Sequence, residues 1–202
     1  MIADLDATIE ALLEEAAEPG SELALSRITF DVPDPGWRAS LESLTVNCYL
    51  YQVRENRELR TMQPLVQRSE DGMRAVRRRP PARIECAYCI TTWSPATEDA
   101  VLEEHRLLGQ VLMVLLRNPA IPTSALRGSL TGQLPPFPTI IAVPDGAGQQ
   151  PDFWSALDLQ LKPSLNYAVT LAAMLDEEPD LDAAPHVVTE VAVTPHHLEE
   201  LP

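Results

Sequence analysis

The sequence is poor in cysteine, in glycine and in long uncharged apolar runs. Three cysteines occur in 202 residues, too few for a disulfide scaffold, so a reducing compartment is expected. Eight glycines leave little scope for a phosphate-cradling loop, and none of the common phosphate, nucleophile-elbow or zinc-protease motifs occurs. No uncharged apolar run reaches the roughly 18 residues of a membrane helix. Acidic residues interrupt the N-terminal apolar stretches, so no signal peptide is predicted.

The charge balance is strongly acidic and uneven. Thirty acidic and 15 basic side chains leave a formal charge of −15, which argues against nucleic acid or anionic lipid as the main partner. Residues 54–83 nevertheless hold nine arginines and only four acids, which is +5 in this segment and −20 in the remainder. The basic segment is therefore the unusual feature of an otherwise acidic chain.

Hydrophobic periodicity predicts two main helices. Apolar residues recur at helical spacing from Ile2 to Ala16, and Pro19-Gly20 ends this first helix. A longer helix is predicted to begin at Pro95, with Ser94 as its cap, and to end at Asn118-Pro119. Its C-terminal half is apolar nearly all round, so we expect it to be covered on several sides by the sheet, by other elements or by another subunit.

Alternating patterns predict a sheet. Strong strands are expected at 44–53 and 83–93, paired antiparallel, with shorter strands at 28–30, 139–143 and 165–171. In the first strong strand, Gln52 is expected on the face of Cys48, and Val53 on the face of Tyr49. Residues 54–82 would then extend both strands into a long hairpin or form an arm, with its tip at 70–72. A proline-rich stretch at 121–138 is expected on the surface, and a short helix near 153–157.

These elements together predict an α/β fold of the α+β type. A mixed, largely antiparallel sheet would pack against the N-terminal helix and the long apolar helix. Chain length favours one domain over residues 1–175. Residues 176–202 form an acidic, proline-punctuated tail in which 187–193 either adds an edge strand or is ordered by a partner.

The cysteines and histidines do not predict a catalytic or metal site. Cys86 and Cys89 form a C-x-x-C motif, but their odd separation in a strand points the thiols to opposite faces, and no further ligands lie nearby. We interpret them as buried structural thiols. His105 lies within the long helix, and the other three histidines lie in the tail. No catalytic residue, cofactor or metal is predicted.

The arginine-rich segment predicts a docking surface for an acidic protein. The guanidinium group presents a fork of donors that matches carboxylates. The interface residues predicted on the two sides of the hairpin are Arg54, Glu55, Asn56, Arg57, Arg60, Arg77, Arg78 and Arg79. The alternative is that Arg54 and Arg57 pair with Glu55, Glu58 or other acids of the same chain.

Four blocks of sequence resemble the tail-terminator, or cap, family of extracellular contractile injection systems, long catalogued as a domain of unknown function. They are TVNCYLYQVRENRELR at 45–60, RPPARIECAYCITTWS at 79–94, EHRLLGQVLMVLLR at 104–117 and LKPSLNYAVTL at 161–171. With the N-terminal helix, the resemblance spans residues 1 to about 175. Some relatives carry longer C-terminal regions. No catalytic residues come with this family.

The resemblance implies an α/β subunit similar to phage tail terminators. It would form a six-membered ring that caps the tube and sheath at the end opposite the baseplate, and its partners would be copies of itself, sheath protein and inner tube protein. Assembly in the cytoplasm is expected, in a particle that is either released or retained. Two alternatives stay open, a cargo adaptor or chaperone of the same system and an unrecognised enzyme.

Overall fold

The computed structural model describes residues 1–61, 63, 65–68, 75–133, 137–142 and 150–174. The chain divides into two compact units. The first comprises Met1–Arg60 with Pro81–Ala173, and the second comprises Thr61–Pro80 with Met174–Pro202. The predicted hairpin tip at 70–72, the tail at 176–202 and the strand at 187–193 lie outside the described residues.

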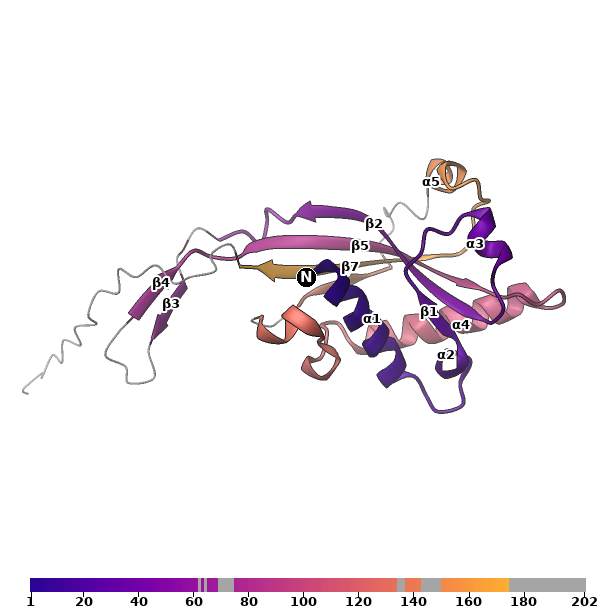
Figure 1. Cartoon of the computed structure of the whole chain (residues 1–202), viewed down its shortest axis with the longest axis horizontal. Coiled ribbons are helices and arrows are strands. Elements are labelled where there is room, and N and C mark those ends of the chain that lie inside the picture. Colours follow the sequence, from indigo (N-terminus) through magenta and orange to yellow (C-terminus); the bar gives the residue numbers. More distant parts are fainter. Residues whose placement is uncertain (62, 64, 69–74, 134–136, 143–149, 175–202) are drawn as a thin grey trace, which may run out of the picture. The chain divides into compact units, whose positions relative to one another are not determined.

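A five-stranded sheet forms the centre of the first unit (Figure 1). Its order is β1-β2-β5-β7-β6, with bounds Arg27–Thr29, Thr45–Glu55, Ala82–Trp93, Leu165–Ala173 and Thr139–Ile141. Only β1 and β2 run parallel, while the other three pairs are antiparallel. The predicted mixed, largely antiparallel sheet and the predicted pairing of its two strong strands are confirmed.

The register of β2 shifts at Tyr51. Leu50 pairs with Tyr88, whereas Gln52 pairs with Ala87. An extra residue in one strand reverses the alternation of side chains beyond it. Gln52 therefore shares a face with Tyr49, and Val53 lies on the face of Cys48. The predicted faces of Gln52 and Val53 were wrong, because a two-residue period contains no signal for a shift that depends on the partner strand.

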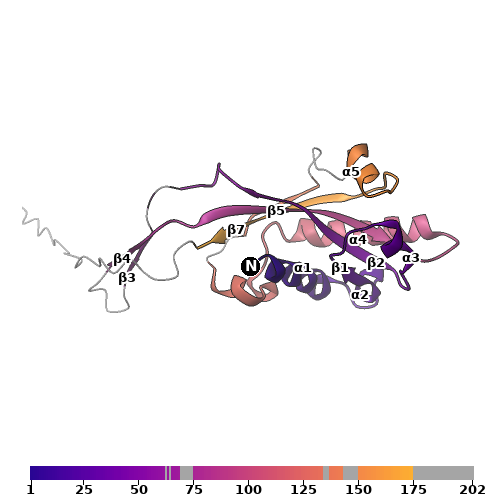
Figure 2. The same ribbon diagram turned by 45° about the horizontal axis from the view of Figure 1, so that its top comes forward.

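Helices α1 (Ile2–Ala16), α2 (Glu22–Leu25) and α4 (Ala100–Arg117) cover one face of the sheet (Figures 1 and 2). The predicted N-terminal helix is confirmed. The large core on this face joins buried residues of these helices to the strands, including Leu12, Leu107, Val111, Tyr88 and Tyr167. Each helix turns its apolar stripe toward the sheet, and burial of those stripes is the main favourable term in folding.

Helix α4 begins five residues later than predicted. The Ser94 hydroxyl donates to Glu103 Oε2 at 2.5 Å and accepts from the Ala96 amide at 3.1 Å, so it closes a turn ahead of the helix. Asp99 then adopts a left-handed backbone conformation with φ of 56° at the N-cap position. A residue in the left-handed conformation cannot be part of a right-handed helix. The helix therefore starts at Ala100.

Five apolar residues of the stretch predicted to follow the surface belong to the core, so that prediction was wrong for them. Two 3-10 helices, η1 (Thr123–Ala125) and η2 (Gly128–Gly132), pack against α1. Ile121, Ala125, Leu126, Leu130 and Phe137 are buried. Prolines exclude regular helix from this stretch, but they do not prevent the apolar residues between them from packing.

The opposite face of the sheet carries a smaller aromatic core. Cys89, Trp93 and Trp154 are buried there. Helices α3 (Pro35–Ala39) and α5 (Pro151–Ala156) contribute Trp37 and Phe153 to this cluster. Trp37 packs edge-on against Trp93, with ring centroids 5.6 Å apart. The predicted short helix near 153–157 is confirmed in α5.

The second unit contains a two-stranded antiparallel sheet, β3 (Leu65–Arg68) with β4 (Ala75–Arg78). The β2–β5 ladder ends at the pair Glu55 and Ile84. The segment between β2 and β5 therefore forms a hairpin of its own instead of extending both strands without a break.

Candidate interaction surfaces

Arg54 lies at the end of β2 and pairs within the chain. Its Nε donates to Glu85 Oε1 at 2.7 Å, and Asn56 Nδ2 donates to Glu85 Oε2 at 3.3 Å. The Glu85 side chain is only 6% exposed, whereas that of Arg54 is 60% exposed. A buried carboxylate needs such partners, since an unpaired buried charge is costly. For Arg54, the alternative prediction of an ion pair with an acid of the same chain therefore holds.

The turn after β2 is built on Asn56. Its amide donates to the Arg83 carbonyl at 2.7 Å, and its side-chain Oδ1 accepts from the Leu59 amide at 3.2 Å. Glu55 and Arg60 form an ion pair of 3.2 Å across the same turn. Glu55, Asn56 and Arg60 therefore make contacts inside the first unit. The ion pair between Glu55 and Arg60 is exposed, so it contributes little to stability.

The remaining predicted arginines differ from these. Arg57 and Arg79 are exposed, and neither forms an ion pair with a described acid. In the backbone register of the second unit, Arg77 lies opposite Val66 and Arg78 opposite Leu65. The structure thus brings together Arg54, Asn56 and Glu85, and it assigns Arg77 and Arg78 to the separate hairpin. The docking role of the set stays a prediction.

The outer face of α4 is a second surface. Leu102, Met113 and Leu116 are exposed and recur at helical spacing, so they form one stripe along the helix. Beside the stripe, between α4 and the end of α1, lies a groove of about 510 Å³ that includes Ala16, Ala17, Gly109 and Met113. The sequence predicted a helix covered on several sides. Within the described residues, this stripe remains exposed.

Ion pairs border the groove near its two ends. Arg106 Nε donates to Glu22 Oε1 at 2.9 Å, and Arg117 Nη1 lies 3.6 Å from Glu18 Oε1. More than half of each arginine side chain is exposed. The groove therefore combines an apolar floor with rims formed by charge-paired side chains. Sequence analysis missed it, although the leucine-rich pattern of α4 indicated excess apolar surface.

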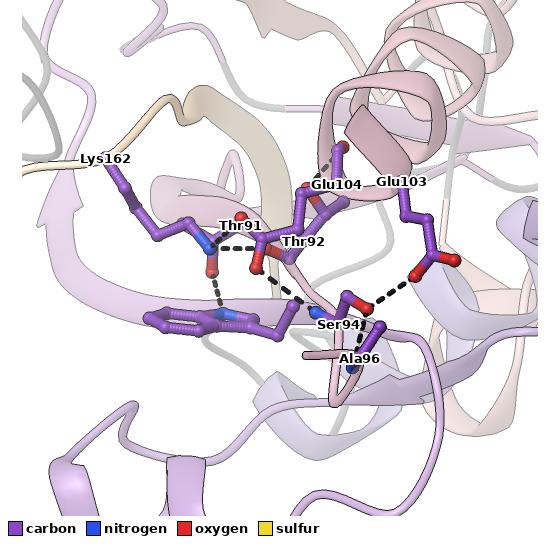
Figure 3. A network of polar contacts seen from close by, with 8 residues as sticks. Thr91, Thr92, Ser94, Ala96, Glu103, Glu104 and Lys162 are labelled. Carbon is purple, nitrogen blue, oxygen red and sulfur yellow. Dashed lines mark hydrogen bonds and ion pairs between the residues drawn. The ribbon is translucent and has the colours of Figure 1, made fainter. Parts of the chain in front are cut away.

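Lys162 is a buried polar centre that sequence analysis did not identify (Figure 3). Its Nζ donates to the Thr92 carbonyl at 2.5 Å and to Glu104 Oε2 at 3.0 Å, and lies 3.5 Å from the centroid of the Trp93 ring. Burial lowers the pKa of Lys162, and the nearby Glu104 carboxylate opposes that shift. The lysine ties α4 to β5 and to the segment before β7. Its ammonium group therefore serves to hold these elements together.

The three cysteines are buried and free. Cys48 and Cys86 lie in the helix-covered core, and Cys89 lies in the aromatic core, which confirms that the C-x-x-C thiols point to opposite faces. Burial raises the pKa of Cys86 and of Cys89 to about 11, so these thiols are poor nucleophiles at neutral pH. Among the described residues, no group of three or more His, Cys, Asp or Glu could hold a metal ion.

An open polar hollow of about 700 Å³ lies between α3 and residues 158–160. Arg38, Ser94, Asp158 and Gln160 contribute to its wall. The Ser94 hydroxyl is held by Glu103, and no histidine or cysteine is among the residues that line the hollow. The wall therefore lacks the nucleophile–base pair of covalent catalysis.

Comparison with known families identifies the chain. The family model described as the Pvc16 N-terminal domain matches residues 4–189. The chain belongs to this family. The resemblance to terminator proteins is confirmed, and both candidate surfaces lie within the matched range.

Solved structures share the fold of the Pvc16 domain. One is the sheath/tube terminator of an extracellular contractile injection system, PVC, in the extended state, with a TM-score of 0.64 and 24% identity. The match covers 100% of this chain and 65% of the terminator. The tube-terminating cap of the anti-feeding prophage has a TM-score of 0.61 and 20% identity over 97% of this chain and 62% of the cap. This chain thus spans less than two thirds of the length of either structure. The search of curated proteins found no match.

Within the part of the chain that the structure describes, no helix combines the length and the apolar character that crossing a membrane requires.

Proposed function

We propose that this chain is a structural assembly protein that caps the tube and sheath of a contractile injection system at the end distal to the baseplate. It would stop polymerisation by forming a ring. The observation that carries this proposal is the Pvc16 family match over residues 4–189, supported by a shared fold with two terminators along almost the whole chain.

Capping a polymer does not require a catalysed reaction. The buried, high-pKa thiols and the polar hollow without a nucleophile–base pair are consistent with a protein that is not an enzyme. An unrecognised enzyme therefore ranks below a structural role.

The partners we propose are further copies of the chain, in a six-membered ring, and the sheath and inner tube proteins. Arg57 and Arg79, which are exposed, are the members of the basic segment that we propose for docking on an acidic surface of the polymer end, together with the two arginines in the sequence of β4. Arg54 and Asn56 hold Glu85 within the first unit and are left out of the proposed docking set. We expect assembly in the cytoplasm, before the particle is released or retained.

Imaging of particles made without this chain tests the proposal. Loss of the cap should leave open ends and tubes of uncontrolled length, because no ring would stop polymerisation. In particles with a tagged chain, label should appear at one end, opposite the baseplate. Normally terminated particles without the chain would contradict capping. Label along the lumen would instead support the cargo adaptor or chaperone.

Charge reversal tests the basic segment. Replacing Arg77, Arg78 and Arg79 by glutamate should abolish end binding, since the change turns attraction to an acidic partner into repulsion. The matched variant with three lysines keeps the charge but loses the guanidinium fork, and should retain part of the binding. Full capping by the glutamate variant would remove these residues from the interface.

A further inference from the structure

The β3–β4 hairpin is a two-stranded sheet with two open edges. Its ladder runs from the pair Leu65 and Arg78 to the pair Arg68 and Ala75, and among the described residues neither strand has a further partner. In an antiparallel pair, alternate residues of each strand direct their backbone N–H and C=O groups away from the other strand. An isolated two-stranded hairpin is at best marginally stable in water. A third strand on one edge should therefore stabilise this hairpin.

The compact unit that contains the hairpin includes one other stretch of chain. This unit consists of Thr61–Pro80 and Met174–Pro202. Within the second stretch, five of the seven residues at 187–193 are β-branched, and the flanking prolines are Pro185 and Pro195. β-Branched residues favour strands, and prolines mark where a strand ends. The sequence at 187–193 is therefore suited to strand addition.

The two stretches of this unit carry opposite charge. Thr61–Pro80 contains five arginines and two acids, a formal charge of +3, whereas Met174–Pro202 contains eight acids and neither lysine nor arginine, a formal charge of −8. Four of the arginines lie at 74–79, within β4 or next to it, whereas β3 holds only Arg68. Attraction between opposite charges therefore favours the edge of β4 for an acidic strand.

Both stretches join the first unit near one pair of residues. Ala173, the last residue of β7, pairs with Ala82, the first residue of β5. Arg78, the last residue of β4, precedes Ala82 by four residues. At roughly 3.3 Å per residue, the chain from Ala173 to Val187 can span about 46 Å, and the chain from Arg78 to Ala82 at most about 14 Å. The tail can therefore reach β4 of its own chain, at the high effective concentration that a short linker gives.

We propose that residues 187–193 add a third strand to the hairpin of the same chain, on the open edge of β4. The acidic tail then has a defined place in the second unit, with Glu190 among the arginines of the 74–79 stretch. This inference goes beyond the proposed function, because it concerns the free chain without tube or sheath protein.

Hydrogen exchange of the full chain, followed by mass spectrometry, tests the added strand. Val191→Pro removes a backbone donor from the middle of the segment and should make amides of β4 exchange at least about tenfold faster, because the outer edge loses its partner. Ala183→Pro places the same residue between the first unit and the segment, and should leave exchange at β4 unchanged. Exchange at Ile90 in β5 reports whether the first unit stays folded.

The same measurement can contradict the proposal. Equal exchange at β4 in Val191→Pro and in the unmodified chain would overturn the added strand. Faster exchange at β3 alone would overturn the choice of edge. If Val191→Pro also speeds exchange at Ile90, Val188→Pro replaces it, since it interrupts the same segment nearer its start.

A photo-crosslinking amino acid at position 190 distinguishes the possible partners of the tail. Crosslinks to residues 74–79 within one chain support the proposal. Mixtures of isotope-labelled and unlabelled chains identify crosslinks between two copies, and a product found only between copies would overturn the assignment to the same chain. Absence of any crosslink to 74–79 would overturn the strand on β4. Both measurements use the free chain, whereas capping is scored on particles, so failure of the added strand and failure of the proposed function give different results.

Discussion

The two faces of the central sheet differ in how they are covered. Helices α1 and α4 and the two 3-10 helices bury a continuous core on one face, with Leu5, Ile9, Tyr88 and Leu107 among its members. The other face has a cluster of three buried residues, Cys89, Trp93 and Trp154, beneath α3 and α5. Burial scales with apolar area, so the first face contributes most of the stability.

The smaller core has a different task. Trp37 packs on Trp93 and also binds both aspartates of the Asp31–Asp34 loop. The aromatic cluster therefore fixes a surface loop as well as covering strand residues. One face thus supplies most of the stability, and the other positions an exposed segment. Substitutions on the two faces should separate these tasks.

The largest effect is expected on the helix-covered face. Ile90 is fully buried there, and Ile90→Ala should lower the free energy of unfolding by about 3 kcal/mol through lost transfer energy and a cavity. Urea unfolding measures the change. Ile140→Ala, at a half-exposed strand position, is the control and should cost less than about 1 kcal/mol. Equal losses at the two positions would contradict the assignment of the main core.

A second effect concerns the anchoring of α1. Gly128 has φ of 54°, and an added Cβ would lie 2.3 Å from Asp4 Oδ1. Gly128→Ala should therefore cost about 1–3 kcal/mol, because the backbone is strained and the Asp4 side chain must leave Ser129.

Gly132→Ala is the matched control in the same 3-10 helix, since its Cβ meets nothing within 4 Å. Urea unfolding of both variants measures the difference. A stable Gly128→Ala protein would show that the contact between Asp4 and Ser129 is dispensable.

On the aromatic face, Cys89→Ala should cost about 1 kcal/mol. Buried cysteine packs as a small hydrophobe, and alanine removes only its sulfur. Its neighbour Ile90 gives a direct contrast between the faces, because it lies one position along β5 but on the other side of the sheet. A loss of unfolding free energy for Cys89→Ala as large as that for Ile90→Ala would show that both faces contribute equally.

The smallest expected effect is a pH dependence of the stability that Asp4 of α1 contributes. The Ser129 hydroxyl and the N-terminal ammonium group lower the pKa of Asp4 to about 2 from an ordinary 3.8. The folded state therefore holds fewer protons than the unfolded state between these values, and the stability that Asp4 contributes above pH 3.8 is lost as the pH falls toward 2. Asp4→Asn should be less stable than the unmodified chain at neutral pH and nearly equal to it near pH 2.

The pH dependence of the stability that Asp6 contributes should have the opposite sign. Burial raises its pKa, although the Tyr88 hydroxyl donates to Asp6 Oδ1 at 2.7 Å and opposes the shift. The folded state then binds more protons just above pH 3.8, so the contribution of Asp6 to stability declines as the pH rises through that window. Urea unfolding at several pH values distinguishes Asp4→Asn from Asp6→Asn. The same slope for both variants would contradict the two environments.

Local patterns in the sequence were enough to predict most elements. Helix α1, strands β2, β5 and β7, the antiparallel pairing of β2 with β5 and the opposite faces of Cys86 and Cys89 all follow from periodicity. The elements and the faces of the two cysteines depend on residues that are close in sequence, whereas the pairing joins two strands that are distant in the chain. Family membership was also recognisable from four such blocks.

Contacts between distant segments were decided by the tertiary structure. Lys162 meets Glu104 across 58 residues, and Arg54 meets Glu85 across 31. The register shift at Tyr51, the burial of Ile121, Leu130 and Phe137 and the exposed stripe of α4 depend in the same way on which surfaces meet. The sequence by itself determined which residues favour helix, strand or burial, because those preferences are local. Which side chains pair, and which apolar residues stay exposed, depends on the packing of the whole chain.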